Sequence, residues 1–184
     1  MNQDEKDYKT FLSGDNSGFE RIVVRYRENL IYFIYRYVQN LHLAEELAQD
    51  TFVELLLHKE RYNFSVSLKT YLFTIGRNKA IDYIRKHKKE VLFDELQEDY
   101  PVEEHQELEA RVIEEENKKI LYQCLEKLKP DYQQAIYLVD IEELSYAATS
   151  QVLQKSMVQM KVLIHRARKA LKKIMEQEGY KYEN

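Results

Sequence analysis

Apolar side chains recur at every third or fourth position through most of the chain, the spacing that places them on one face of an α-helix. The clearest stripe spans residues 17–39 and contains Phe19, Ile22, Val23, Tyr26, Leu30, Phe33, Ile34 and Tyr37. A shorter helix is predicted over residues 3–12, and Gly14 ends it. The N-terminal part is therefore expected to be helical, with its core along the long helix.

Two further helices are predicted on either side of a short aromatic loop, residues 62–67. The first starts near Leu43, ends near Lys59 and carries an acidic face made of Glu45, Glu46, Asp50 and Glu54. The second runs from about Ser67 to Lys86, and its polar face contains Thr70, Thr74, Arg77, Asn78 and Arg85. Because one helix is acidic and the next presents cations and amides, the sequence indicates two partners of opposite charge.

The C-terminal part contains the pattern of a helix-turn-helix. A short helix over residues 145–153 is followed by a turn at Gln154 and Lys155 and by a longer helix that begins after Ser156. The core stripe of the longer helix consists of Met160, Ile164, Ala167, Leu171 and Ile174. From Lys155 to Lys173 there are seven basic residues and no acidic ones. A basic helix in the second position of a helix-turn-helix is typical of DNA-binding domains.

Three helix starts carry the signature of a capping box, in which a polar residue is followed three positions later by Glu or Gln. The pairs are Ser17 with Glu20, Asp131 with Gln134, and Ser156 with Gln159.

Composition and charge divide this pattern into domains. Only 4 glycines and 2 prolines occur in 184 residues, which favours an all-α fold over a hairpin-rich β fold. Residues 1–89 carry 15 basic and 12 acidic side chains, residues 90–116 carry 1 and 12, and residues 117–184 carry 12 and 8. We therefore expect two mildly basic helical domains, 1–89 and 117–184, joined by an acidic linker, 90–116. The linker is expected to start as a loop and to enter a helix from about Val102 to Lys129.

The sequence lacks the patterns of a catalytic or metal site. It has no phosphate-binding glycine loop, no His, Cys or carboxylate set at metal-ligand spacing, and no recognisable nucleophile–base pair. We expect a protein that is not an enzyme and that needs no cofactor. Its one cysteine, Cys124, lies in an apolar run and is expected to be buried. The absence of a disulfide pair, a signal peptide and a long apolar segment favours a cytoplasmic protein.

Two stretches resemble a known family. The segments L-A-E-E-L-A-Q-D-T-F and S-L-K-T-Y-L-F-T-I-G-R-N-K-A-I-D-Y-I-R resemble region two of the extracytoplasmic-function (ECF) sigma factors, and the likeness extends from Gly14 to Lys89. The segment S-M-V-Q-M-K-V-L-I-H-R-A-R-K-A-L resembles sigma region four, within a weaker likeness over residues 120–175. The resemblance implies a sigma factor that binds core RNA polymerase, recognises a promoter and helps to melt its minus-ten element.

The resemblance also implies roles for particular residues. Those expected to bind core polymerase are Glu45, Glu46, Leu47, Gln49, Asp50 and Phe52. Those expected to bind the minus-ten element, with a base flipped into the loop, are Arg61, Tyr62, Asn63, Phe64, Lys69, Tyr71, Arg77, Asn78 and Arg85. Those expected to bind the minus-thirty-five element are Ser156, Gln159, Lys161, His165, Arg166, Arg168 and Lys169. An anti-sigma factor is a further partner implied by the family alone.

The chain departs from the family pattern at several positions. Tyr71 stands where the family usually has tryptophan, and Thr149, Ser150, Gln154 and Val158 differ from the usual helix-turn-helix residues. Gln154 stands where glycine usually adopts the left-handed conformation. Two other interpretations stay open at this stage: a free-standing helix-turn-helix regulator, and a sigma-like scaffold without promoter activity. The acidic linker fits either a solvated spacer or a segment that occupies the basic RNA channel of polymerase.

Overall fold

The computed structural model describes residues 2–91 and 116–180, which belong to two compact units. The described residues form helices and turns without any strand, which confirms the expected all-α fold. Most of the acidic linker, including the start of the helix expected from Val102, lies outside the described residues. The domain boundaries that we placed at residues 89 and 117 therefore stay predictions.

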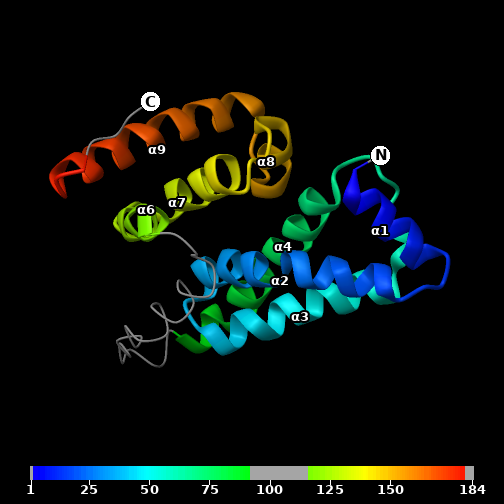
Figure 1. Ribbon diagram of the computed structural model, residues 1–184. Helices are drawn as coiled ribbons and strands as arrows, with labels where there is room; N and C mark the ends of the chain where they lie inside the picture. The colour runs from blue at the N-terminus through cyan, green and yellow to red at the C-terminus, as the bar shows by residue number, and fades with distance from the viewer. Residues whose placement is uncertain (1, 92–115, 181–184) are drawn as a thin grey trace. The chain divides into compact units, whose positions relative to one another are not determined.

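The first unit is built around one long helix (Figure 1). Its elements are α1 (Gln3–Leu12), α2 (Ser17–Val38), α3 (Leu41–Leu57), the short 3-10 helix η1 (Lys59–Arg61) and α4 (Leu68–Val91). α2 packs against α1, α3 and α4. Every residue of α2 from Leu30 to Arg36 is buried, so this stretch is surrounded on all sides. α2 is therefore the core helix that the apolar stripe predicted.

The two helix starts in this unit differ from the predicted ones. The side chain of Asn40 accepts a hydrogen bond of 2.8 Å from the backbone N–H of Leu43, so α3 begins at Leu41, two residues early. The capping box predicted for Ser17 and Glu20 is wrong. Asp15 already accepts from the Ser17 N–H at 2.9 Å, and Ser17 is the first residue inside α2.

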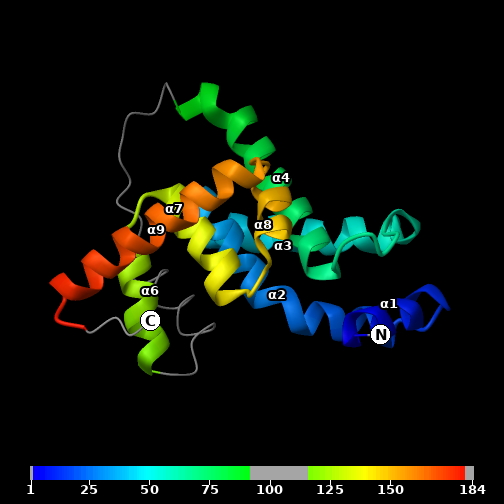
Figure 2. The same cartoon turned by 90° about the horizontal axis from the view of Figure 1, so that it is seen from above.

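The second unit contains the predicted helix-turn-helix (Figure 2). Its elements are α6 (Glu116–Glu126), α7 (Pro130–Ile136), the π-helical turn η2 (Tyr137–Ile141), α8 (Tyr146–Leu153) and α9 (Met157–Gln177). α9 packs on α6, α7 and α8 through buried Met160, Ile164, Ala167 and Leu171. The predicted core stripe of the last helix is confirmed except at Ile174, which is half-buried.

Of the two capping boxes predicted in this unit, one is confirmed and the other is wrong. The Ser156 hydroxyl accepts from the Gln159 N–H at 3.2 Å, and the Gln159 side chain accepts from the Ser156 N–H at 2.8 Å, which confirms that capping box. Asp131 is not a cap, because α7 begins at Pro130 and Lys129 is its N-cap. Proline favours the first helical position, since its fixed φ fits the helix and its missing N–H is not needed there.

The turn between α8 and α9 requires an unusual backbone. Gln154 has φ 53° and ψ 45°, the left-handed conformation that the family position predicts. A residue with a side chain is strained there by about 1 kcal/mol relative to glycine. Gln154→Gly is expected to raise the free energy of unfolding of the second unit by about 1 kcal/mol.

The matched control is Gln151→Gly, at an exposed position inside α8. Glycine there is expected to cost about 1 kcal/mol, because it is a poor residue for a helix interior. Denaturant unfolding of both variants would measure the two changes. If both substitutions destabilised the unit alike, the strain assigned to Gln154 would be ruled out.

A second departure from the family pattern lies in the packing of α8. Thr149 is fully buried, and its hydroxyl finds no hydrogen-bond partner in the part of the chain that the structure describes. Burying an unpaired hydroxyl costs about 1–3 kcal/mol. Thr149→Val, which replaces the hydroxyl with a methyl of similar volume, is expected to stabilise the second unit by about 1 kcal/mol.

Thr51 in α3 provides the control, because it is equally buried but its hydroxyl donates to the Leu47 carbonyl at 2.9 Å. Thr51→Val removes a made hydrogen bond, so we expect no stabilisation from it. Melting temperatures of the two variants would test this contrast. A Thr149→Val protein less stable than the wild type would contradict it.

Candidate nucleic-acid interface

The α3 residues that we expected at a polymerase interface lie at different depths. Leu47 and Phe52 are buried, whereas Gln49 and Asp50 are exposed. Glu46 is exposed as well, and Glu45 is half-buried. The motif therefore combines core residues that fix the position of α3 with polar residues that a partner can reach.

A cleft of about 410 Å³ lies between α2 and α3. Four of the six predicted residues line it: Glu45, Glu46, Gln49 and Phe52. α2 contributes Phe19, Val23, Arg27 and Ile31, and α3 adds His42, Ala48, Val53 and Leu56. Val53 and Leu56 are more exposed than is usual for apolar side chains within a helix, which gives the cleft an apolar, accessible edge. Neither residue was among those expected to bind core polymerase, although both follow Gln49 at helical spacing.

The aromatic loop after η1 is organised around a buried tyrosine. The Tyr62 hydroxyl donates to the Val66 carbonyl at 2.9 Å, and its ring centroid lies 4.8 Å from that of Phe64 and 5.1 Å from that of Tyr71. Burial raises the pKa of Tyr62 to about 12, so the hydroxyl stays protonated and keeps this bond at neutral pH. We expected Tyr62 to offer a free face to a base, but the structure places it beneath the loop.

Phe64 is the aromatic residue that the loop turns outward. Its side chain is 37% exposed, and its φ is 62°, a conformation that bulky residues rarely adopt. Such strain persists only where the surroundings impose it, and it gathers at functional sites. Asn63 stabilises the turn, because its side-chain oxygen accepts from the Ser65 N–H at 3.0 Å. Phe64 therefore provides an accessible ring on a preformed loop.

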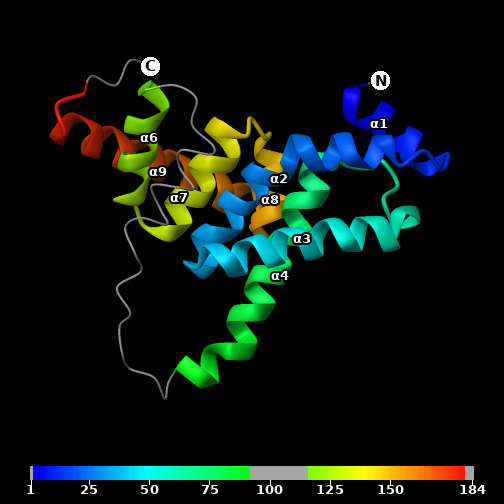
Figure 3. The same cartoon turned by 60° about the horizontal axis from the view of Figure 1, so that its bottom comes forward.

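Helix α1 lies beside this loop and contacts it through Tyr8 (Figure 3). The Tyr8 hydroxyl donates to the Lys59 carbonyl at 2.7 Å, and the Tyr8 ring makes edge contacts with Tyr62 at 4.7 Å and Phe64 at 5.7 Å between centroids. Burial raises the pKa of Tyr8 well above its ordinary value. No local pattern in the sequence predicted this contact, because its two sides are about fifty residues apart.

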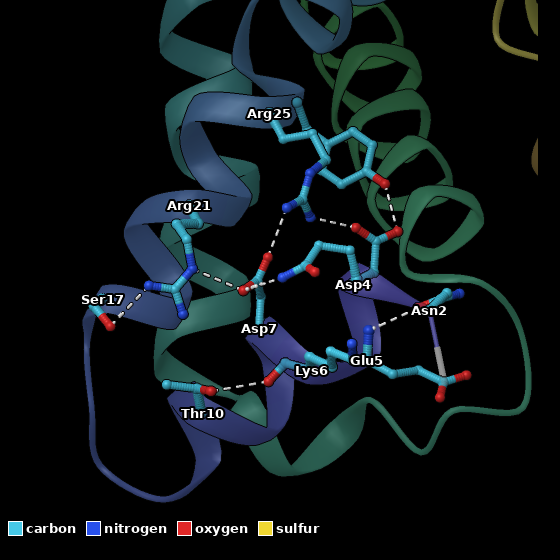
Figure 4. Close-up of polar contacts among 11 residues, drawn as sticks. Asn2, Asp4, Glu5, Lys6, Asp7, Thr10, Ser17, Arg21 and Arg25 are labelled. Carbon is cyan, nitrogen blue, oxygen red and sulfur yellow. Dashed lines mark hydrogen bonds and ion pairs between the residues drawn. The ribbon is translucent and has the colours of Figure 1, made fainter.

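A network of charges ties α1 to α2 (Figure 4). The buried carboxylate of Asp7 accepts hydrogen bonds from Arg21 at 2.7 Å, Arg25 at 2.6 Å and Gln3 at 3.0 Å. Burial alone would raise the pKa of this carboxyl, but the three hydrogen bonds outweigh burial and lower the pKa to about 2. Arg25 also bonds Asp4 at 2.5 Å. The network holds α1 in the position from which Tyr8 reaches the loop.

The other residues expected at the minus-ten element are Arg61, which ends η1, and five residues of α4: Lys69, Tyr71, Arg77, Asn78 and Arg85. Asn78, Arg61 and Arg85 are exposed, while Lys69, Tyr71 and Arg77 are half-buried. The Nε of Arg77 is buried and has no hydrogen-bond partner among residues 2–91 and 116–180. Thr70, which we expected on this face, is buried instead and bonds Ser67 at the start of α4.

The outward face of α9 carries most of the predicted minus-thirty-five residues. Lys161, His165, Arg166 and Lys169 are exposed. Ser156 and Gln159 are exposed as well, although their side chains form the capping box. Arg168 is bound within the unit, because its guanidinium pairs with Asp140 and donates to the Tyr146 hydroxyl at 3.2 Å. Its geometry favours a role in fixing α9 on η2 and α8.

Two family models match the chain. The model of Sigma-70 region 2 matches residues 22–90, a range that contains α3, the aromatic loop and nearly all of α4. The model of Sigma-70 region 4 matches residues 118–171, which includes the helix-turn-helix. The chain is also 31% identical over 153 residues to the ECF RNA polymerase sigma factor SigM of Bacillus subtilis, covering 83% of this chain and 92% of SigM.

The chain belongs to the ECF family of RNA polymerase sigma factors. A second relative, SigW of B. subtilis, is 29% identical and covers 92% of this chain and 95% of its own length. This ECF sigma factor therefore directs RNA polymerase to promoters for transcription initiation. The free-standing regulator is excluded, because it would leave the region 2 match unexplained.

Solved structures support the fold of this sigma factor. CnrH, in complex with the cytosolic domain of CnrY, matches with a TM-score of 0.65 at 23% identity, covering 96% of this chain and 99% of CnrH. RpoE from Bartonella quintana, in complex with the anti-sigma factor NepR, matches with a TM-score of 0.64 at 21% identity. The match covers 86% of this chain and 96% of RpoE. Within residues 2–91 and 116–180, no helix combines the length and apolar character needed to cross a membrane.

Proposed function

We propose that this sigma factor divides promoter opening among three surfaces of its own chain. The polar rim and apolar edge of the α2–α3 cleft bind core polymerase. The loop around Phe64 and the polar face of α4 capture the minus-ten element. The outward face of α9 binds the minus-thirty-five element. The chain acts by binding, without enzymatic activity, and works in the cytoplasm, where polymerase is found.

The cleft suits a protein partner. Its accessible edge, Val53 and Leu56, can be buried on binding. Glu46 adds a charge at the cleft, and exposed Asp50 lies one helical turn further along α3. Apolar contact at the centre of an interface supplies affinity, and the charged rim mainly sets orientation and association rate. The Asp50 and Glu46 carboxylates would face a basic surface on polymerase.

The observation that carries the minus-ten assignment is the outward ring of Phe64, held by a strained backbone over buried Tyr62. A ring of this kind can stack on a base that has left the duplex. Asn78 offers an amide to a base edge, and Arg61 and Arg77 offer cations to the phosphates. Tyr71 is half-buried against Tyr62, so it would support the platform in place of a larger tryptophan.

We also propose an anti-sigma partner. CnrH was solved in complex with the cytosolic domain of CnrY, and RpoE in complex with the anti-sigma factor NepR. The accessible apolar residues at the cleft would make it a suitable surface for an inhibitor as well as for polymerase. An inhibitor bound there would exclude polymerase by competition.

Separating the surfaces by mutation tests the proposal. Phe64→Gly relieves the left-handed strain but removes the ring's contacts with Tyr8 and Tyr62. The two effects oppose each other, so the free energy of unfolding is expected to change by no more than about 1–2 kcal/mol. Promoter opening, measured as permanganate-reactive thymines, is expected to fall at least about tenfold, because one stacking platform is lost. Binding to core polymerase should not change.

The double variant Gln49→Ala, Asp50→Ala is expected to differ from Phe64→Gly in the polymerase-binding assay. It should weaken binding to core polymerase by about tenfold. Gln123→Ala, an exposed position in α6, serves as the control for both assays. If Phe64→Gly opened promoters as the wild type does, and substitution of Arg77 and Asn78 also had no effect, the minus-ten assignment would fail and a scaffold role would replace it.

A further inference from the structure

Two exposed valines lie at the centre of the outward side of α9, opposite its buried stripe. Val158 is 74% exposed and Val162 is 44% exposed. At 100° per residue, they form one row with His165 and Lys169, directly opposite the buried stripe that begins at Met160. Neither valine was among the minus-thirty-five residues expected from the sequence.

The two valines are apolar, whereas the side chains on either side of the row are cationic. Lys161 lies on one side of it and Arg166 and Lys173 on the other, and the segment from Lys155 to Lys173 contains no acidic residue. The pair of valines in this row, bordered on both sides by cations, fits a polyanion that also presents apolar groups. The major groove of DNA has both properties, because each thymine exposes a C5 methyl on its base edge and the phosphate backbones border the groove.

The position of the valines along the helix supports the same partner. A recognition helix contacts base edges mainly through its N-terminal residues, and both valines lie in the first two turns of α9. His165 and Lys169 follow further along the helix. Valine also favours helix less than alanine does, so helix stability does not explain its presence at two exposed positions.

We infer that Val158 and Val162 read thymine methyl groups in the minus-thirty-five element. This inference rests on the proposed role of α9. The two residues are one helical turn apart, about 6 Å along the axis. Base pairs are spaced by about 3.4 Å, so the two thymines are expected about two base pairs apart.

The test removes only the methyl groups. Selection of transcribed promoters from a library with a randomised upstream element, using holoenzyme, would first give the preferred element. Deoxyuridine would then replace each thymidine of that element in turn, and competition would measure holoenzyme affinity. At two positions the loss is expected to be about fourfold, which corresponds to burying one methyl on apolar surface.

Variants of the sigma factor assign each methyl to a side chain. With Val158→Ala, deoxyuridine at one of the two positions should no longer reduce affinity, and with Val162→Ala the same should hold at the other. Both side chains are exposed, so folding is not expected to suffer. Lys161→Ala is the control, because loss of a phosphate contact weakens thymidine and deoxyuridine DNA equally.

The outcomes separate this inference from the proposed function. A preferred upstream element with no deoxyuridine effect, or with the same effect in both alanine variants, would overturn the methyl-reading role and leave the α9 assignment standing. A selection with no upstream preference would reject both. Loss of polymerase binding in the valine variants would instead assign the row to a protein contact and overturn the inference.

Discussion

Replacing Asp7 with asparagine is expected to lower the free energy of unfolding of the first unit by about 2 kcal/mol at pH 7. Breaking a fully buried ion pair costs about 3–5 kcal/mol. Here Asp7 is 1% exposed, but its partners Arg21 and Arg25 are 48% and 33% exposed and can regain water. The smaller figure follows from that partial exposure. Denaturant unfolding of the full chain, with hydrogen exchange of peptides from residues 2–91, would measure it.

The same substitution predicts a pH dependence. The pKa of Asp7 is lowered to about 2 in the folded protein, so its stabilisation is complete above its ordinary pKa of 3.8 and is lost as the pH falls toward 2. The stability difference between wild type and Asp7→Asn should therefore narrow over this window. Asp82→Asn, at an exposed residue with an ion pair of 3.7 Å, is the control and should change little. A difference that stayed constant down to a pH of about 2.5 would contradict the assignment.

Gly18→Ala is the second substitution expected to have a large effect. A Cβ at this position of α2 would lie 2.2 Å from the Asp7 carbonyl oxygen and 2.8 Å from the Phe11 nitrogen. Both atoms belong to the α1 backbone, so α1 would have to move away. We expect a net loss of about 2–3 kcal/mol, even after the gain that alanine brings to a helix.

Gly76→Ala provides a matched control within a buried helix. Its Cβ would approach the end of the Leu30 side chain at 2.8 Å, and a side chain can rotate away more easily than backbone. Gly76→Ala should therefore lower the free energy of unfolding by clearly less than Gly18→Ala does. In the Gly18 variant, exchange of α1 amides should rise first, and promoter opening should fall with polymerase binding retained, since Tyr8 no longer supports the loop. Equal losses in the two variants would rule out the backbone contact as the cause.

Helical periodicity and local chemistry predicted much of the fold. The α2 stripe, the helix-turn-helix, the Ser156 capping box and the buried Cys124 depend on residues close together in sequence. The left-handed conformation of Gln154 was instead implied by the family resemblance. The failed caps at Ser17 and Asp131 have local causes as well. Asp15 already accepts from the Ser17 N–H, and Pro130 occupies the first position of α7.

The burial of the site residues and their contacts within the protein could not be predicted from helical periodicity. Leu47 and Phe52 matched a motif but lie in the core, because their neighbours on α2 are set by tertiary packing. Tyr62 is buried by Tyr8, a residue far away along the chain. Arg168 was expected to contact DNA, but its guanidinium pairs with Asp140, a residue that lies far from it in sequence. Conversely, Val158 and Val162 could have been found by extending the helical wheel to the outward face of α9.

The most direct test of the account is run-off transcription of fragmented genomic DNA by core RNA polymerase, with and without this chain, followed by sequencing of the transcripts. We expect new start sites that share a minus-ten element and, upstream of it, a minus-thirty-five element. If no new start sites appeared although the chain co-purified with polymerase, promoter recognition by this chain would be contradicted and a scaffold role would take its place.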